Sequence, residues 1–342
     1  MRLEAVHQFH PALTTGDGVS SGMLFTRRLL RELGFASEIY CERAPVELDE
    51  QLLPLASMAL DAGQLLLVHH SLGYENAAWL AEVRTPKVLV YHNITPEHLL
   101  PPDSEIGLCA RLGRQQLKDW APDYLGAIGD SDTNSAELRA AHYRNVKTIP
   151  LLVDTARVRQ APYDPNAATG LRDSLNLLFV GRICANKRQL ELIEMLAEFL
   201  HFTDQPVRLI LAGGVTSHDY LALIEARIRE LGLQNNVILA GKVPAATLTA
   251  LYRNADAFIS MSEHEGFGMP LIEAMLFDVP VLAHAASSIP GTMGEGGLLL
   301  HDDHPRAVAA TLHMLLTEPA LRRRTIAGQR RNLQRFAPAQ LL

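Results

Sequence analysis

The sequence predicts an α/β fold made of two doubly wound parallel-sheet (Rossmann-like) domains that face a cleft. Three observations carry this prediction. The chain has 342 residues, enough for about two domains of ~150 residues each. Short apolar runs alternate with amphipathic stretches, an order that is typical of parallel sheets covered by helices. The alternation occurs twice, and paired layered domains commonly bind a ligand between them.

A polar, turn-rich segment separates the two alternating halves. It contains Pro162 and Pro165, residues that interrupt regular structure. We therefore assign residues 1–158 to a first domain, 159–170 to a linker and 171–335 to a second domain.

The first half contains apolar runs of strand length, rich in branched and aromatic residues. The predicted strands are residues 3–8, 37–41, 65–69, 88–92, 125–129 and 146–149. The stretches between them carry apolar residues at the spacing of an amphipathic helix. The predicted helices are residues 23–33, 76–82, 108–120 and 135–142.

The second half repeats the pattern with longer helices. Its predicted strands are residues 175–180, 208–211, 237–240, 257–261, 279–283 and 298–300. Its predicted helices are residues 189–200, 219–231, 245–253, 270–277, 306–317 and 319–335. Pro270 suits the first turn of its helix, where the missing N–H costs nothing.

The composition narrows the class of function. The net charge of −7 gives no general reason to bind nucleic acid, and we interpret the arginine clusters in residues 27–31 and 322–335 as solvated helix faces. Three distant cysteines without a C-x-x-C pair indicate reduced thiols and a cytoplasmic protein. The N-terminus lacks the apolar core of a signal peptide, and no apolar run approaches the ~18 residues that span a bilayer. Any membrane contact is therefore expected to be peripheral, at the inner face of the cytoplasmic membrane.

The most informative motif is a glycine-rich turn between two carboxylates. Glu265 and Glu273 lie on either side of the point where a predicted buried strand gives way to a predicted helix. The amides of residues 266–269 are expected to face a ligand at that helix start, which suits an anion or a hydroxyl group. Gly266 and Gly268 allow a close approach to the backbone, and carboxylates accept hydrogen bonds from sugar hydroxyls. The motif therefore predicts a sugar site.

The same motif has a structural alternative. In that interpretation Glu273 complements the helix dipole, an effect of about 0.3–1 kcal/mol, and Glu265 is a solvated loop residue. A pair of cations favours the functional interpretation. Arg182 follows a predicted strand and Lys187 lies at the start of the next helix, beyond the carboxyl end of the strand, where doubly wound sheets bind ligands. Two fixed cations there suit a diphosphate, and the alternative is a solvated surface pair.

A glycine loop follows the first predicted strand. Gly16, Gly18 and Gly22 approach the G-x-G-x-x-G dinucleotide motif but have one residue too many before the third glycine. Glu42 stands where such a site needs an acid after the second strand. A dinucleotide-dependent oxidoreductase that uses residues 16–22 is therefore an alternative, although the long loop fits a phosphate-covering loop better.

Histidines gather near the ends of strands in the first half. His92 ends a predicted strand and is expected to face the cleft. A metal cluster of His7, His10, His69 and His70 is a minor alternative, because no metal-ligand spacing supports it.

An Asp-x-Asp run, Asp130-Ser131-Asp132, follows another predicted strand. This spelling can hold a metal and a nucleotide. We interpret these residues as helix caps instead, with Asn134 and Glu137 spaced as a capping box.

With these residues in view, the chain resembles the retaining glycosyltransferases of family 4, which have the GT-B architecture, over nearly its whole length. The strongest parts are the E-x7-E element, Glu265 to Glu273, and the Gly-Arg pair with its following lysine, Arg182 to Lys187. The resemblance implies an acceptor-side first domain and a second domain that binds a nucleotide sugar. It also implies a reaction that moves a hexose of mannose or glucose type from a UDP- or GDP-sugar to a glycan or polyprenyl-linked acceptor. No cofactor and no metal are expected.

The resemblance also implies a role for each matching residue. Arg182 and Lys187 would hold the donor diphosphate, with Gly16 and Gly18 covering it. Glu265 would act on the donor sugar together with the amides of Gly266, Phe267 and Gly268, and Glu273 would bind the ribose. His92 would lie near the reacting centre and, with Glu265, would be a catalytic residue. Gly213 and Val243 would lie near the base.

Two departures from the family pattern stand out. Pro290-Gly291 replaces the usual Pro-Glu, so a loop contact is expected to be lost. Residues 336–342 form only a short or truncated version of the helix that crosses back to the first domain. A GT-B-shaped binding protein without activity is a further alternative, against which the intact set of charged residues argues.

Overall fold

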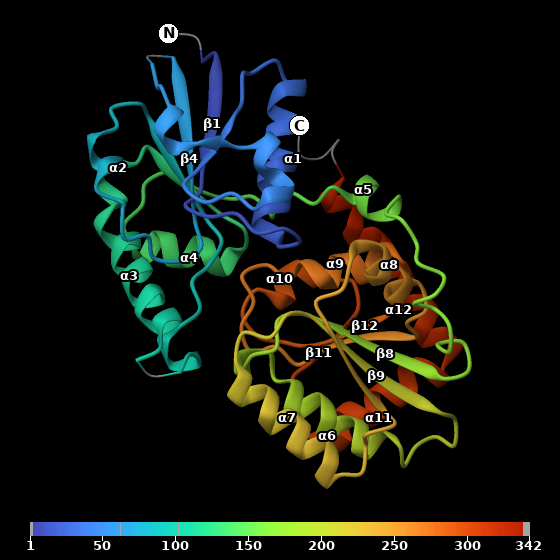
Figure 1. The fold of residues 1–342 in the computed structure, drawn as a ribbon. Helices are drawn as coiled ribbons and strands as arrows, with labels where there is room; N and C mark the ends of the chain where they lie inside the picture. Colours follow the sequence, from blue (N-terminus) through green and yellow to red (C-terminus); the bar gives the residue numbers. More distant parts are fainter. Residues whose placement is uncertain (1–2, 62, 102, 338–342) are drawn as a thin grey trace. The chain divides into compact units, whose positions relative to one another are not determined.

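The computed structural model describes residues 3–61, 63–101 and 103–337. The chain forms two compact units, residues 1–154 and 155–342 (Figure 1). The division falls before residue 158, where we predicted the first domain to end, so the segment we predicted as a linker belongs by its contacts to the second unit.

In the described part of the first unit, all strands run parallel in one sheet of order β3-β2-β1-β4-β5-β6-β7. The strands are β1 (Ala5–Phe9), β2 (Ile39–Cys41), β3 (Leu53–Pro54), β4 (Gln64–His70), β5 (Lys87–Tyr91), β6 (Gly126–Gly129) and β7 (Val146–Thr148). The α-helices are α1 (Gly18–Glu32), α2 (Trp79–Glu82), α3 (Glu105–Asp119) and α4 (Asp132–Ala140). Short 3-10 turns are η1 (Val46–Gln51), η2 (Leu55–Ser57), η3 (Glu97–Leu99) and η4 (Ala121–Asp123).

The second unit repeats the design, and within its described residues the parallel sheet has the order β10-β9-β8-β11-β12-β13. The strands are β8 (Leu175–Val180), β9 (Val207–Ala212), β10 (Val237–Gly241), β11 (Ala257–Ser260), β12 (Val281–His284) and β13 (Leu298–Leu300). The helices are α5 (Thr155–Arg159), α6 (Gln189–Phe199), α7 (His218–Glu230), α8 (Ala245–Arg253), α9 (Met269–Leu276), α10 (Ile289–Met293), α11 (Pro305–Thr317) and α12 (Pro319–Leu333), with 3-10 turns η5 (Ala185–Lys187) and η6 (Gln334–Phe336).

Helices cover both faces of the second sheet. Figure 1 shows α6, α7 and α11 on one face and α8, α9 and α10 on the other. A central strand between two helical layers must be apolar on both faces, and β8 meets this requirement with Leu177, Leu178 and Phe179, all at most 1% exposed. The predicted α/β class with two doubly wound parallel sheets is therefore confirmed.

Each sheet has one point where the strand order reverses. In the first sheet this point lies between β1 and β4, and in the second between β8 and β11. Loops that follow the two strands leave in opposite directions there and open a crevice beyond their carboxyl ends, where ligands of this fold bind. The residues after β8 and β11 include both charged motifs of the second half, Arg182 with Lys187 and Glu265 with Glu273.

Besides the 3-10 turns, one strand and two α-helices of the described residues were absent from the sequence prediction. β3 has two residues, and α5 and α10 have five each, so none holds a full period of hydrophobic pattern. Pro290 and Gly291 lie within α10. The C-terminal tail is described only as far as residue 337, where Phe336 is 1% exposed; residues 338–342 lie outside the described part.

Candidate functional site

The predicted diphosphate lysine and the predicted sugar carboxylate are in direct contact. Lys187, at the end of η5, places its Nζ 2.7 Å from Oε1 of Glu265. The same ammonium group donates to the backbone carbonyl of His264 at 2.9 Å. The side chains are only 9% and 20% exposed. Lys187 is therefore not the solvated cation of the alternative interpretation, and an anion that reached it would share it with Glu265.

The backbone of the glycine-rich turn is held by hydroxyl groups. Ser287 and Ser288 both donate to the carbonyl of Glu265, each at 2.8 Å, and Thr292 donates to the carbonyl of Phe267. A planar trans peptide points its C=O and N–H in opposite directions. The N–H of Gly268, which shares a peptide plane with the Phe267 carbonyl, therefore points away from Thr292.

The turn leads into α9 through a glycine that the geometry requires. Gly268 caps the helix with φ 90° and ψ 50°, and a Cβ there would lie 2.9 Å from a methyl group of Leu271. Phe267 is 5% exposed and packs edge-on against Phe336 with ring centroids 5.8 Å apart. Phe267 can therefore offer a ligand its backbone but not its ring.

Glu273 is a partly buried carboxylate with one fixed partner. The hydroxyl of Tyr252 in α8 donates to its Oε2 at 2.8 Å. Burial raises the pKa of Glu273, and the hydrogen bond from Tyr252 partly opposes that rise. The first turn of α9 holds no acidic residue, so Glu273 lies outside the zone where the helix dipole acts. The structural alternative for Glu273 is therefore not supported.

The other predicted residues of this half also follow strands of the second sheet. Arg182 is exposed, and its carbonyl accepts from Nε2 of Gln189 at 2.8 Å. Gly213 follows β9 with φ 156°, and a Cβ there would lie 1.9 Å from the carbonyl oxygen of Gly181, so the close approach of two loops demands glycine. Val243, after β10, is partly exposed. These residues lie at the same edge of the sheet as Lys187.

In the first unit, His92 lies within a chain of buried hydrogen bonds. Its Nδ1 is 2.6 Å from Oδ2 of Asp130, and its Nε2 is 2.7 Å from Nδ1 of His69. Nε2 of His69 is 3.0 Å from Oε1 of Gln8, whose Nε2 donates to the carbonyl of Met23 at 3.1 Å. The His92 side chain is 3% exposed and both of its ring nitrogens have partners. We call Gln8, His69, His92 and Asp130 the histidine relay.

Our interpretation of the Asp-x-Asp run was partly wrong. Ser131 is the N-cap of α4 and accepts from the N–H of Asn134. Asp130 is no cap, because its carboxylate is committed to His92. The predicted capping box is also wrong, since the helix begins three residues before the position that we assumed and Asn134 lies inside it, where its side chain bonds Asn93.

The remaining histidines of this edge have protein partners. Nε2 of His10 is 3.0 Å from the hydroxyl of Ser71, and Nε2 of His70 is 2.9 Å from the carbonyl of Gly113. Burial lowers the pKa of His10 to about 4 and that of His70 to about 4. Among the residues described by the structure, no three His, Cys, Asp or Glu side chains are grouped to hold a metal ion.

The glycine loop before α1 is organised by an aspartate. Asp17 is the N-cap and accepts from both the N–H and the hydroxyl of Ser20, at 2.6 and 3.0 Å. Gly16 has φ 83°, with open space where a Cβ would stand. Gly18 is the first residue of the helix. Glu42, the acid of the dinucleotide alternative, accepts a 2.5 Å hydrogen bond from the hydroxyl of Tyr74, so it is already engaged.

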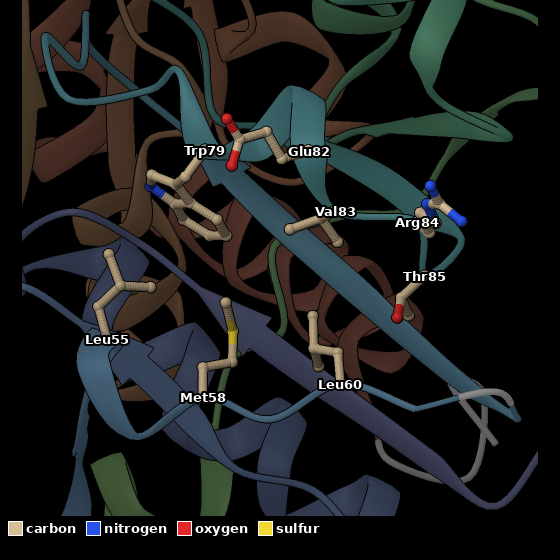
Figure 2. A pocket seen from close by; sticks show the side chains of 8 residues that line it. All are labelled: Leu55, Met58, Leu60, Trp79, Glu82, Val83, Arg84 and Thr85. Carbon is tan, nitrogen blue, oxygen red and sulfur yellow. The ribbon is translucent and has the colours of Figure 1, made fainter.

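A shallow hollow of about 680 Å³ lies elsewhere on the first unit (Figure 2). Its walls are Leu55, Met58, Leu60, Trp79, Glu82, Val83, Arg84 and Thr85. The hollow contains none of the residues predicted for the site, and Trp79 in its wall packs edge-on against Phe9, the last residue of β1, with ring centroids 4.8 Å apart.

Three arginines of the two arginine clusters contact carboxylates. Arg28 contacts Asp154 at 2.8 Å, Arg31 contacts Glu38 at 2.7 Å, and Arg330 contacts Asp278 at 2.7 Å. Within the described residues, no helix is both long enough and apolar enough to cross a bilayer.

Two Rossmann-like units, each built on a parallel sheet with one switch point, have the architecture of the GT-B glycosyltransferases. Residues 168–332 match the family described as Glycosyl transferases group 1. The predicted resemblance to glycosyltransferases is confirmed.

Relatives and solved structures agree with this assignment. The chain is 36% identical over 246 residues to the D-inositol 3-phosphate glycosyltransferase of Kineococcus radiotolerans, covering 64% of this chain and 54% of that protein. It therefore spans about half the length of that relative. A glycosyltransferase from Rickettsia africae has a similar fold, with a TM-score of 0.76, 16% identity, and coverage of 99% of this chain and 95% of that one. Anabaena HepE, solved with UDP and glucose, gives a TM-score of 0.75 at 18% identity over 97% of this chain and 95% of that one.

Proposed function

We propose that this protein moves a hexose from a nucleoside-diphosphate sugar to a hydroxyl group of a glycan or polyprenyl-linked acceptor, with retention at the anomeric carbon. The observation that carries the proposal is the contact between Lys187 and Glu265 beyond the carboxyl ends of β8 and β11. The ammonium group of Lys187, which suits a diphosphate, is in direct contact with the carboxylate of Glu265, which suits a sugar. The group 1 domain supports the same reaction class.

In this proposal the charge that develops on the leaving diphosphate is stabilised by protein groups. Arg182 is exposed and able to turn toward a phosphate, while Lys187 is fixed in place. Preorganised cations act strongly on a developing charge because they need no rearrangement during the reaction. Two positive charges also match a diphosphate without a metal ion, so we propose that no divalent metal is required.

The sugar and the nucleotide are assigned to the two carboxylates. Glu265 and the turn at residues 266–268 would hold the sugar. Glu273 would accept from the ribose hydroxyls through the oxygen that Tyr252 does not use. Gly213 and Val243 would border the base, and Gly16 and Gly18 would cover the diphosphate. UDP is the first nucleotide to test, because the HepE structure of similar fold contains it, and GDP is the second.

The catalytic role that we propose for His92 is electrostatic. A catalytic proton donor must present an N–H to the substrate, but both ring nitrogens of His92 already have partners within the protein. We therefore assign His92 to the site as an electrostatic group.

A donor panel tests the proposal directly. UDP-, GDP- and ADP-sugars would each be incubated with the protein in excess chelator, and release of the nucleoside diphosphate would be measured with and without acceptors. Acceptor arms would include polyprenyl-linked glycans and inositol phosphates, the latter because of the name of the Kineococcus relative. We expect one donor to be consumed. Failure of the folded protein to bind any of the free nucleoside diphosphates would contradict the proposal.

A further inference from the structure

The histidine relay has hydrogen-bond acceptors at both of its ends. At one end, the carbonyl of Met23 has no proton to give. At the other, the Asp130 side chain is 4% exposed and its Oδ2 lies 2.6 Å from Nδ1 of His92. An ionised carboxylate is likewise only an acceptor. Every proton in the chain between these two ends must therefore come from Gln8, His69 and His92.

The contacts fix each donor in turn. Because Met23 only accepts, the amide nitrogen of Gln8 faces it and the amide oxygen faces His69. His69 must then carry its proton on Nε2 to donate to that oxygen. Burial lowers the pKa of His69 well below its usual value, so a second proton on this ring is disfavoured. Nδ1 of His69 is consequently an acceptor.

The protons of His92 follow from its two hydrogen-bond partners in the same way. With Nδ1 of His69 accepting at 2.7 Å, Nε2 of His92 must carry a proton. With Asp130 accepting at 2.6 Å, Nδ1 of His92 must carry one too. A neutral His92 would leave two lone pairs facing each other across a short contact, which costs the full desolvation penalty of unpaired groups.

We propose that Gln8 and His69 are positioning residues that hold His92 as a doubly protonated imidazolium, paired with the carboxylate of Asp130. The relay then places a fixed ion pair beyond the carboxyl ends of β5 and β6 and joins it to α1 through Met23. The neighbouring ionisable groups do not supply a competing charge. His10, after β1, and His70, on β4, are neutral at pH 7, since burial lowers the pKa of each to about 4.

The inference goes beyond the proposed transferase reaction and needs no donor to be tested. Protein labelled with 15N-histidine would be studied at pH 7 by long-range proton–nitrogen correlation NMR, which distinguishes N–H from bare ring nitrogens. Signals would be assigned from His69→Gln and His92→Gln. We expect two N–H nitrogens for His92, and one N–H at Nε2 for His69. A bare Nε2 on His92, or a proton on Nδ1 of His69, overturns the proposal whatever donor the enzyme uses.

Two variants test the proposal further. In each of them we expect a neutral His92, but with its remaining proton on a different ring nitrogen. In Gln8→Leu, His69 loses its acceptor and is free to move its proton to Nδ1, so His92 keeps only its Nδ1 proton. In Asp130→Asn, the new amide can turn to donate to Nδ1, so His92 keeps only its Nε2 proton. Gln116→Leu removes another buried glutamine of the same unit, whose partner is Tyr74, and should leave the His92 signals unchanged. An imidazolium that persists in both relay variants contradicts the proposal.

Discussion

Removing the lysine of the Lys187–Glu265 contact should destabilise the fold as well as slow the reaction. In Lys187→Ala, the carboxylate of Glu265 stays in a largely buried position without its counter-ion. Breaking a buried ion pair in this way costs about 3–5 kcal/mol. Glu265 keeps 20% of its side chain exposed, so we expect the lower end of that range, about 3 kcal/mol. Urea unfolding of the variant and the wild type measures this difference.

A double variant separates the pair energy from other losses. Lys187→Ala combined with Glu265→Ala removes the unpaired charge. The double variant should therefore be more stable than Lys187→Ala alone, by at least ~1 kcal/mol. Arg330→Ala is the matched control, because its contact with Asp278 is exposed and should matter far less. The reasoning is refuted if the double variant is no more stable than the single one. In kinetic assays on folded protein, Lys187→Ala should also lower kcat/KM by at least ~100-fold, since one preorganised donor is lost.

Four further predictions concern the donor site and the cap of α4. Glu265→Gln keeps an acceptor for Lys187 and should lower kcat far more than it lowers stability; near wild-type turnover would remove Glu265 from the site. Glu273→Gln should weaken binding of the free nucleoside diphosphate ~10- to 100-fold, as expected for one charged hydrogen bond of roughly 1.5–3 kcal/mol, and titration calorimetry decides this. Since burial raises the pKa of Glu273 above 4.5, its ionised form is disfavoured in the folded state. The same variant should therefore be at least as stable as wild type at pH 7 and should lose that advantage as the pH falls through the raised pKa toward 4.5. Finally, turnover should survive excess chelator; turnover that chelator abolishes and a divalent ion restores would favour a metal-dependent reaction. Ser131→Ala should lower the free energy of unfolding by about 1 kcal/mol, because α4 loses its N-cap.

The sequence was sufficient for the architecture because parallel strands between helices are buried on both faces. Their apolar runs are therefore nearly continuous and easy to locate. The elements that escaped prediction are too short to show a pattern, as with the two residues of β3. The charged motifs could be predicted because each follows a strand directly, and the topology brings the carboxyl ends of neighbouring strands to one edge.

The partners of those motifs could not be predicted. Tyr252 lies in a different helix from Glu273, and nothing in their spacing links them; only the packing of α8 against α9 brings the hydroxyl to the carboxylate. The same holds for Gln8 and His69, which come from β1 and β4. His92 is the clearest case. Its place at a strand end was predictable, but its hydrogen-bond partners on both sides come from other elements, and its catalytic role stays a prediction.

The hydroxyls that hold the glycine-rich turn show how the site and the backbone strain are connected. Ser287 adopts φ 52°, in the left-handed region that residues other than glycine seldom occupy. A serine in such a conformation persists only where its surroundings compensate for the strain, commonly at functional sites. Its hydroxyl makes one of the two bonds to the Glu265 carbonyl. A glycine would relieve the strain but lose the hydroxyl, so the strain and the anchoring of the Glu265 backbone are two consequences of the same side chain.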